Sequence, residues 1–475
     1  MTTLMQQRIG RRTVLKQGVG LLAAPWILSG RAHALQPSER IAVGFIGVGM
    51  MGRAHLRRMV TNPDVQVLAV CDVDDWRLQD AQALVEKTYA GWQKGGTFKG
   101  CAAYTDFREV LARQDIDAVL IASGDRWHAV HTVMAARAGK DIYCEKPISL
   151  TIHESRAMVD AVRRYDRVFQ GGFQQRSVRD FRVAVQLIHS GRLGRLKHIY
   201  CNWVGTSGLV NLPAEPVPPT LDWDLWVGPA AWHPFNNRFH RLGEPQRTVP
   251  WDFNRDFAGG SITSNGVHHL DIAQWALGMD ESGPVEIVPP GPGQAIVTYK
   301  YASGVIVQSF PHRLDPKLQE IPEGFDASMR FMWEVLFVGE HGWILAGRQG
   351  PLKANPPEIL AGVDVSDPPD PPAAAPAARP PDGRTGATTP QELAEQLYKA
   401  RGYTHHDNWI QAIRMRQRTI SDVECAARST NVAHLANVAT WTGRTQKWDP
   451  VSEAFVADDE ANRMRQRPLR EPWTL

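Results

Sequence analysis

The sequence predicts an α/β fold of two domains, of which the first contains a doubly wound parallel sheet. Three observations lead to this prediction. A short apolar run passes through a glycine-rich turn into a helical stretch near residue 50, apolar strands then alternate with helical stretches as far as residue 144, and hairpin patterns follow after residue 290. A chain of 475 residues is also too long for a single ordinary core.

The first predicted strand, RIAVGFI at residues 40–46, suits a buried parallel strand, and it leads directly into the turn GVGMMG. In such a turn the first glycine permits the tight bend, the second lets the backbone approach a pyrophosphate, and the third lets the following helix pack on the strand. The N-terminus of that helix attracts phosphate. The pattern predicts a Rossmann domain whose dinucleotide contacts Gly47, Gly49, Met51 and Gly52.

A second strand, VQVLAVC, ends at Asp72, which lies 20 residues beyond Gly52. At that position a carboxylate accepts the adenosine ribose hydroxyls and repels a 2′-phosphate, so NAD is favoured over NADP. Arg77 is close enough in sequence to keep NADP as the less favoured alternative.

Two more apolar strands are expected at residues 117–122 and 141–144. Ligands of a doubly wound sheet gather at the carboxyl ends of its strands, where these two carry SGDRWH and EKP. The side chains predicted to contact the cofactor at this edge are Ser123, His128, Glu145 and Lys146.

The N-terminus reads as an export signal. Residues 10–16, GRRTVLK, contain a twin-arginine pair, a modest apolar run follows, and Ala32-His33-Ala34 resembles a cleavage site. The run is shorter than the ~20 apolar residues of a spanning helix. We therefore expect a twin-arginine signal at residues 1–34, recognition by that export machinery and a periplasmic mature protein. An ordinary amphipathic leader or an uncleaved anchor is the alternative. Because this route carries folded proteins and dinucleotide is not supplied outside the cytoplasm, a tightly held cofactor is expected.

Charge and cysteine content exclude several classes of partner. The first 34 residues carry five basic groups and no acid, so the rest of the chain has a formal net charge of −2, against +3 for the whole. This argues against nucleic acid and anionic membranes as partners. The five cysteines are widely spaced, without a CxxC pair, so neither a zinc site nor a disulfide framework is expected.

Seven segments, in this order, resemble the Gfo/Idh/MocA oxidoreductase family: IGVGMMG, CDVD, ASGDRWHA, CEKP, GGFQQR, DWDLWVGP and GVHHLD. Near the C-terminus, HHDNW, ISDVE and REPW resemble a signal-bearing subgroup of it. The resemblance covers nearly all of residues 38–475. It implies a Rossmann domain followed by an α/β domain with an open, mostly antiparallel sheet, and homo-oligomers formed through that sheet.

The resulting domain prediction is a Rossmann domain at 38–150 and a substrate and oligomerisation domain at 151–475. The sequence supports the second domain independently, because residues 199–204 read as a strand and residues 294–310 and 329–348 as hairpins. Residues 351–391 are rich in Pro, Ala, Asp and Gly, which predicts an insertion without a packed core of its own.

Oxidation of a secondary alcohol needs a base and a group that stabilises the developing alkoxide. The resemblance implies that Lys146 of the EKP segment is catalytic and contacts the cofactor. His268 is the candidate base, and Asp271, one turn later, can hold its imidazole or a substrate hydroxyl. Polyol dehydrogenases of the family place an Asp four residues before this histidine, where this chain has Ser264. Since serine cannot raise the basicity of His268 by charge, the proton relay is expected to be weaker or rearranged.

The predicted substrate contacts come from three segments: Trp127, Arg176, Ser264, His269 and Asp271. His269 is second to His268 as the base because it is equally close in sequence. The crowding of His405, His406 and Asp407 resembles a metal site, but these residues are better explained as the start of a helix, and no metal is expected.

Together these observations predict an NAD-dependent oxidoreductase that oxidises or reduces a sugar or polyol at a CH–OH group, with tightly bound cofactor. The main alternative is an NAD-dependent, redox-neutral glycoside hydrolase that acts through a transient keto-sugar. An aldose oxidoreductase that recycles its own NAD fits equally well. A non-catalytic binding protein is disfavoured because Lys146 and His268 are both present.

Overall fold

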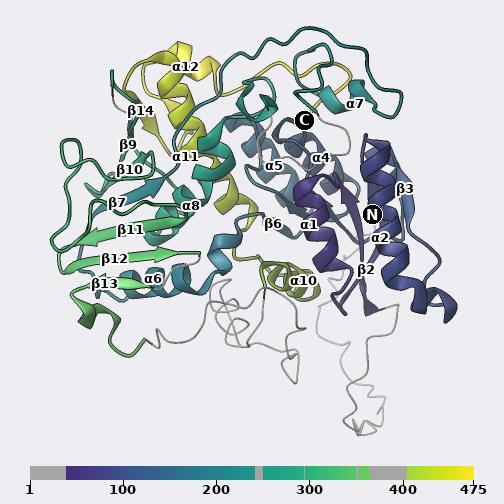
Figure 1. Ribbon diagram of the computed structural model, residues 1–475, viewed down its shortest axis with the longest axis horizontal. Coiled ribbons are helices and arrows are strands. Elements are labelled where there is room, and N and C mark those ends of the chain that lie inside the picture. The colour runs from purple at the N-terminus through teal and green to yellow at the C-terminus, as the bar shows by residue number, and fades with distance from the viewer. Residues whose placement is uncertain (1–38, 241–249, 294, 349–351, 364–403) are drawn as a thin grey trace, which may run out of the picture.

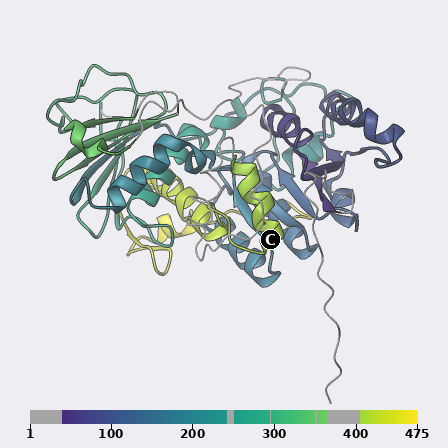
Figure 2. The ribbon, with the colours of Figure 1, turned by 90° about the horizontal axis from the view of Figure 1, so that it is seen from below.

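The computed structural model describes residues 39–475 except 241–249, 294, 349–351 and 364–403. The predicted signal segment, residues 1–34, lies outside the described residues. Two sheets lie at opposite ends of the molecule in both ribbon views, with helices between them (Figures 1 and 2). The predicted two-sheet α/β architecture is confirmed.

The first sheet has six parallel strands in the order β3-β2-β1-β4-β5-β6. Its strands are β1 (Ile41–Ile46), β2 (Val65–Cys71), β3 (Ala102–Tyr104), β4 (Ala118–Ile121), β5 (Asp141–Cys144) and β6 (Phe169–Gly171). The strand order reverses between β1 and β4, which is where a doubly wound sheet binds its ligand. The sixth strand lies beyond the predicted boundary at residue 150.

The helices of this domain differ in how they begin. They are α1 (Met50–Met59), α2 (Asp75–Lys94), α3 (Phe107–Ala112), α4 (Asp125–Arg137) and α5 (Ile152–Arg164). Side chains of Asp74, Asp106 and Thr151 accept backbone N–H bonds at the starts of α2, α3 and α5. By contrast, α1 and α4 start at Gly49 and Gly124, which offer no side-chain cap. Their N-termini therefore keep backbone N–H groups available for a ligand.

The second sheet has nine strands in the order β13-β12-β11-β7-β10-β9-β8-β14-β15. Only the β7–β10 pairing is parallel among the described strands, so the sheet is mostly antiparallel, as predicted. The strands are β7 (Leu196–Asn202), β8 (Glu286–Val288), β9 (Val297–Lys300), β10 (Ile306–Phe310), β11 (Glu334–Gly339), β12 (Gly342–Gly347), β13 (Lys353–Asn355), β14 (Gln446–Asp449) and β15 (Ala454–Phe455). The two predicted hairpins are β9–β10 and β11–β12.

Three helices join the two sheets into one body. They are α6 (Arg179–His189), α8 (Val267–Ala276) and α11 (Val423–Thr442), and they contact strands of the second sheet, while α11 also packs on α5 (Figure 2). Val133 of α4, Val267 of α8 and Val335 of β11 belong to the same continuous buried cluster. This shared core holds the edges of both sheets in a fixed relation around the space between them.

The C-terminal region also returns to the first domain. Helix α10 (His405–Met415) begins with a capping box formed by Thr404 and Asp407, as expected for a helix start, and fully buried Trp409 packs in the core of the parallel sheet. Two further α-helices in the described residues are short, α7 (Trp223–Val227) and α12 (Asp459–Arg463). None of the described helices combines the length and apolar composition needed to cross a membrane.

The first part of the segment predicted as an insertion, residues 351–391, packs on the second sheet. Residues Lys353–Asn355 form β13 at the edge of the second sheet, and Pro357–Leu360 form a 3-10 turn. Leu352 and Ile359 are buried in the main core, which is why this part is ordered despite its proline content. Residues 364–391 lie outside the described residues.

Candidate active site

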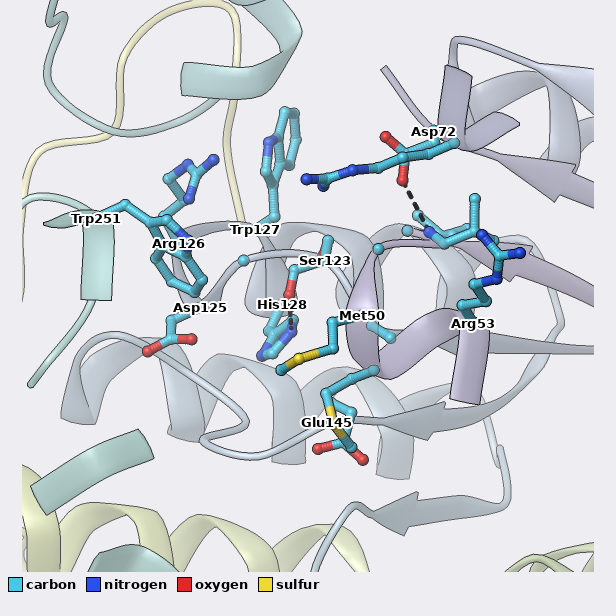
Figure 3. Close-up of a pocket in the computed structure, with 18 of the residues that line it drawn as sticks. Met50, Arg53, Asp72, Ser123, Asp125, Arg126, Trp127, His128, Glu145 and Trp251 are labelled. Atoms are coloured by element: carbon cyan, nitrogen blue, oxygen red, sulfur yellow. Dashed lines mark hydrogen bonds between the residues drawn. The ribbon is translucent and has the colours of Figure 1, made fainter. Parts of the chain in front are cut away.

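A cavity of about 780 Å³ opens at the carboxyl edge of the parallel sheet. Its walls come from the glycine turn, the ends of β2, β4 and β5, and segments of the second domain around residues 225–268 and 333–348. In Figure 3, Asp72 and Asp125 lie at opposite ends of this cavity, with Ser123 and His128 between them. The cavity thus spans the strand-order reversal and reaches the second domain, as a site for a long cofactor and a substrate requires.

The glycine turn has the close approaches that its sequence predicts. Gly47 has a φ of +86°, and a Cβ there would lie 2.7 Å from the backbone of Ala122. A Cβ on Gly52 would collide with the carbonyl oxygen of Gly47. Gly49 and Met51 line the cavity, and a Cβ on Gly49 would meet only the guanidinium of Arg77, at 3.2 Å. This cradle, open to the uncapped start of α1, fits a dinucleotide pyrophosphate.

Asp72 stands directly after β2 and ties that strand end to the glycine turn. Its Oδ2 accepts a hydrogen bond from the Val48 N–H at 2.8 Å, and its Oδ1 accepts one from the Asp74 N–H at 3.1 Å (Figure 3). The side chain lines the cavity and is 8% exposed. Its carboxylate is therefore held at the depth where the ribose nearest the glycine turn would lie.

Ser123, Trp127 and His128 all line the cavity, but Trp127 and His128 also make hydrogen bonds that stabilise the fold. The His128 ring lies between two carbonyl oxygens, with Nδ1 2.7 Å from Pro147 and Nε2 2.9 Å from Ser123. Burial lowers the pKa of His128, so the neutral ring can donate to only one of them. Trp127 donates its indole N–H to the Leu225 carbonyl and is 5% exposed. His128 therefore links the ends of β4 and β5, and Trp127 links α4 to the segment around Leu225.

Glu145 is anchored by a buried network that sequence reasoning did not find. Its Oε1 lies 2.8 Å from Nε2 of His55 on α1 and accepts a 2.6 Å bond from the Gln174 amide. His55 in turn contacts Nε2 of His406 on α10, at 2.8 Å. Although burial alone would raise it, the hydrogen bond from His55 and the charge of Lys146 lower the pKa of Glu145 to about 2. Glu145 therefore places a fixed negative charge beside Lys146.

Lys146 reaches across the cavity from β5 to the second domain. Its Nζ donates a 2.5 Å hydrogen bond to the carbonyl oxygen of Ser264, which lies in a π-helical turn, Ile262–Gly266, just before α8. The Lys146–Pro147 peptide bond is cis. The side chain of Ser264 accepts only a 3.4 Å bond from its neighbour Asn265 among the described residues. The backbone of Ser264, rather than its hydroxyl, therefore positions the lysine.

His268, the predicted base, also lines the cavity and is 4% exposed. Within the described part of the chain, its buried Nδ1 has no hydrogen-bond partner. Burial, together with the charges of Arg348 and Lys146, holds the pKa of His268 well below its usual value. The ring is therefore neutral and a weaker base than an ordinary histidine.

Three predicted substrate contacts lie behind the cavity wall instead of in it. Arg176 is 1% exposed and pairs with Asp271 at 2.8 Å and with Asp280 at 2.7 Å. Asp271 also accepts a bond from Ser429, so it does not hold the His268 imidazole. His269 is fully buried, with its Nδ1 3.2 Å from the Asn202 carbonyl. Helical periodicity explains the placement of His269, because the residue next to His268 points to another face of α8. Asp271 lies one turn from His268 and is held instead by its ion pair with Arg176.

The structure adds two carboxylates that sequence reasoning missed. Asp125 opens α4 and is 6% exposed, and its Oδ2 has no hydrogen-bond partner among the described residues. Asp252 lies in the 3-10 turn Pro250–Phe253 and lines the same cavity. Burial raises the pKa of Asp252 to about 6. Burial, with the charge of Asp252, raises the pKa of Asp125 to about 8. Such unpaired carboxyl groups in a cavity are typical of functional sites.

Only one of the missed residues left a signal in the sequence. Asp125 directly follows a predicted strand, at the edge where ligands bind, and could have been selected with Ser123 and His128. Asp252 lies in an irregular segment, and Arg348, a third cavity residue, ends a hairpin of the second sheet. Neither has a local pattern that indicates its position.

Comparison with known proteins assigns both halves of the chain to the same protein family. One family model, described as the oxidoreductase family with an NAD-binding Rossmann fold, matches residues 41–173. A second model, the C-terminal α/β domain of the same family, matches residues 192–307 and 391–475. A myo-inositol 2-dehydrogenase of Thermotoga maritima is 28% identical over 224 residues, which are 46% of this chain and 58% of the relative.

Two further matches illustrate the range of similar proteins. A glycosyl hydrolase family 109 protein of Shewanella pealeana is 29% identical over 160 residues, 34% of either chain. An aldose–aldose oxidoreductase from Caulobacter crescentus, solved with glycerol, superimposes with a TM-score of 0.52 at 18% identity over 86% of this chain and 99% of that one. This chain spans between a third and three fifths of the length of these two sequence relatives. The matched domains, the cradle around Gly47 and Asp72, and the fold show that the chain belongs to the Gfo/Idh/MocA oxidoreductase family and that its first domain binds NAD.

Proposed function

We propose that this protein is an NAD-dependent oxidoreductase that acts on a secondary CH–OH group, or the corresponding carbonyl, of a sugar or polyol. The observation that carries the proposal is the position of Lys146. Its ammonium group crosses the cavity between the glycine turn and His268, where one hydroxyl of a small substrate can meet it. The inositol dehydrogenase among the relatives supports a polyhydroxylated substrate.

Bound NAD would supply a nicotinamide carbon that accepts or returns a hydride. The protein's own residues provide the rest of the chemistry. Gly47 and Asp72 position the dinucleotide, and Lys146 stabilises negative charge on the substrate oxygen as its proton leaves. Glu145, whose charge is fixed by His55, keeps Lys146 at this side of the cavity.

Two groups can accept the hydroxyl proton, His268 and Asp252. A general base works best when its pKa is close to the working pH. The pKa of His268 lies well below its usual value, whereas the pKa of Asp252 is raised to about 6. We therefore propose Asp252 as the base and His268 as a hydrogen-bond donor or acceptor that orients the substrate. In this arrangement, Asp252 would take the place of the aspartate that polyol dehydrogenases of the family carry at the position of Ser264.

The proposed function is tested with protein purified without added NAD. Released cofactor is identified by mass spectrometry, and the holoprotein is mixed with a panel of polyols, aldoses and sugar acids while absorbance near ~340 nm reports reduced nicotinamide. We expect bound NAD and its reduction by at least one panel member. A protein that binds no dinucleotide would contradict the proposal.

Asp125 favours a redox-neutral glycoside hydrolase as the second candidate. With a pKa raised to about 8, Asp125 is protonated at neutral pH and can donate a proton to a leaving group, which simple alcohol oxidation does not require. The glycosyl hydrolase relative also favours it. Chromatography of products from methyl glycosides distinguishes the two, because only the hydrolase releases methanol and free sugar without net reduction of NAD.

We also propose export by the twin-arginine route and a periplasmic mature protein that starts near Leu35. The support is the pair Arg11-Arg12 followed by Ala32-His33-Ala34. Replacing both arginines by lysine is expected to leave the protein in the cytoplasmic fraction, detected by immunoblotting after cell fractionation. An unchanged periplasmic yield would refute this route.

We further propose that the protein is a homo-oligomer, with copies meeting through the face of the second sheet opposite α6, α8 and α11. Light scattering of the purified protein should give a mass of at least two chains, and a monomeric mass would contradict this assembly.

A further inference from the structure

Arg348 is held rigidly in the cavity wall beside His268. Its guanidinium carbon lies 4.1 Å from the ring centroid of Trp333, a cation–π stack. With the Gln175 amide in the orientation that its surroundings require, Arg348 Nε donates to Gln175 at 3.0 Å. The same amide donates to the carbonyl oxygen of His268 at 2.9 Å. The stacked face of the guanidinium and its Nε atom therefore hold Arg348 in place.

Trp333 is itself fixed by its neighbours. It lies against His268, Trp203 and His269, with ring-centroid distances of 6.5, 5.4 and 5.9 Å. Trp203 has a φ of +74°, a strained conformation for a bulky residue, and is tied down by a 2.7 Å bond from its N–H to the Asn202 side chain. Strain of this kind persists where the surrounding structure holds the residue in place, so Arg348 is stacked on a rigid wall.

In the part of the chain that the structure describes, the charge of Arg348 is not paired with a carboxylate. Among the described residues, no carboxylate lies within 4.0 Å of its guanidinium, and burial lowers its pKa to about 10. Two other enclosed arginines are engaged by protein groups. Arg176 is paired with two aspartates, and Arg126 donates to the carbonyl oxygen of Trp226. The nearest negative charge that acts on Arg348 is Glu145, which His55 and Gln174 already engage. An enclosed, unpaired cation is costly unless a ligand neutralises it.

We infer that Arg348 binds an anionic substituent of the substrate, a carboxylate or a phosphate, next to the reacting hydroxyl. The inference rests on the proposed function, since it names a substrate class for the same cavity: sugar acids or sugar phosphates. The terminal guanidinium nitrogens match the two oxygens of a carboxylate. Asp252 would be ionised at neutral pH and would repel a second anion from the part of the cavity near Lys146. Asp125 would be neutral there and could donate a hydrogen bond to another substrate oxygen.

The test measures binding without turnover. Quenching of tryptophan fluorescence reports ligands in the cavity, which is lined by five tryptophans including Trp333. The probes are D-glucose, D-glucuronate, D-gluconate and D-glucose 6-phosphate. The variants are Arg348→Met, which removes the charge, Arg348→Lys, which keeps a charge without the fork, and Arg195→Met, an exposed control on the rim of the second sheet. NAD content and melting temperature of each variant show whether it is folded.

We expect wild-type protein to bind at least one anionic probe ~10- to 100-fold more tightly than glucose, the range of a charge-assisted bidentate contact. Arg348→Met should remove that preference by weakening the anionic probe more than glucose, Arg348→Lys should restore part of it, and Arg195→Met should behave as wild type. A preference for gluconate or glucuronate identifies a carboxylate substrate, and one for glucose 6-phosphate identifies a phosphate substrate.

Equal binding of glucose and all anions by wild type, or equal weakening of every probe in Arg348→Met, would overturn the inference. Anion binding without NAD reduction by any panel member would instead count against the proposed oxidoreductase function and leave the Arg348 site standing.

Discussion

Replacing Lys146 by methionine is expected to lower kcat for substrate-dependent NAD reduction by roughly 10²–10³-fold. Lys146 carries the only side-chain ammonium group that lines the described cavity, and its Nζ lies 2.5 Å from the Ser264 carbonyl, between the two domains. Methionine keeps much of the length of the chain but cannot stabilise an alkoxide. The loss should therefore appear in kcat, measured by absorbance of reduced nicotinamide under substrate saturation.

The control for this change is Lys353→Met, because Lys353 is an exposed lysine on β13, away from the cavity. It should retain wild-type kcat. Bound NAD should remain detectable in Lys146→Met after gel filtration, since Gly47, Gly52 and Asp72 are untouched. If Lys146→Met retained wild-type kcat with full NAD content, the proposed role of the lysine would be refuted.

Asp252→Asn is expected to lower kcat/KM by roughly 10²–10⁴-fold, the usual effect of removing a general base. Its carboxyl must be ionised to accept a proton, and burial raises its pKa to about 6. The wild-type rate should therefore increase as pH rises through about 6 and fall as pH drops below it. In Asp252→Asn this acid limb should be absent.

Two variants separate Asp252 from its neighbours. Asp256 lies four residues after Asp252, contacts His233 at 2.7 Å and is not part of the cavity lining. The Asp256→Asn variant should therefore keep both the wild-type rate and the wild-type pH profile. His268→Gln should raise KM more than it lowers kcat and should preserve the acid limb. Loss of the limb in His268→Gln, with a normal profile in Asp252→Asn, would identify His268 as the base.

The charges that face Asp252 explain why its titration should be visible. Lys146, at the end of β5, acts on both Asp252 and Asp125, and Asp252 acts on Asp125 at the start of α4. Arg126 stacks on Trp226 and donates to its carbonyl at 2.9 Å. Because the pKa of Asp125 is raised to about 8, Asp125 is neutral when Asp252 ionises near pH 6. The two carboxyl groups should titrate as a coupled pair in two steps.

The parallel sheet and the cofactor half of the site could be predicted from the sequence because they depend on local patterns. The turn between β1 and α1 needs glycine at 47 and 52, and a carboxylate at 72 follows from the length of one βαβ unit. Lys146 could be predicted for the same reason, since it directly follows a strand. The hairpins of the second sheet were visible as paired apolar runs around glycine turns.

The substrate half of the site depends on how the two domains pack, and local patterns do not encode that packing. Arg176 and Asp271 satisfy each other's charge inside the core, which neither residue reveals in sequence. Asp252 and Arg348 reach the cavity only because the second sheet and its helices close over the edge of the first. The sequence of an irregular segment does not show whether a polar residue will be paired inside the core or will line the cavity.

The central claim, that a substrate carbon transfers hydride to NAD held in this cavity, is tested most directly with deuterium. The panel member that reduces the bound NAD is supplied fully deuterated at carbon, the cofactor is released by denaturation, and its mass is measured. We predict that reduced cofactor carries one deuterium and that its formation slows relative to the unlabelled substrate. Product formed while the bound cofactor acquires no deuterium would contradict the account.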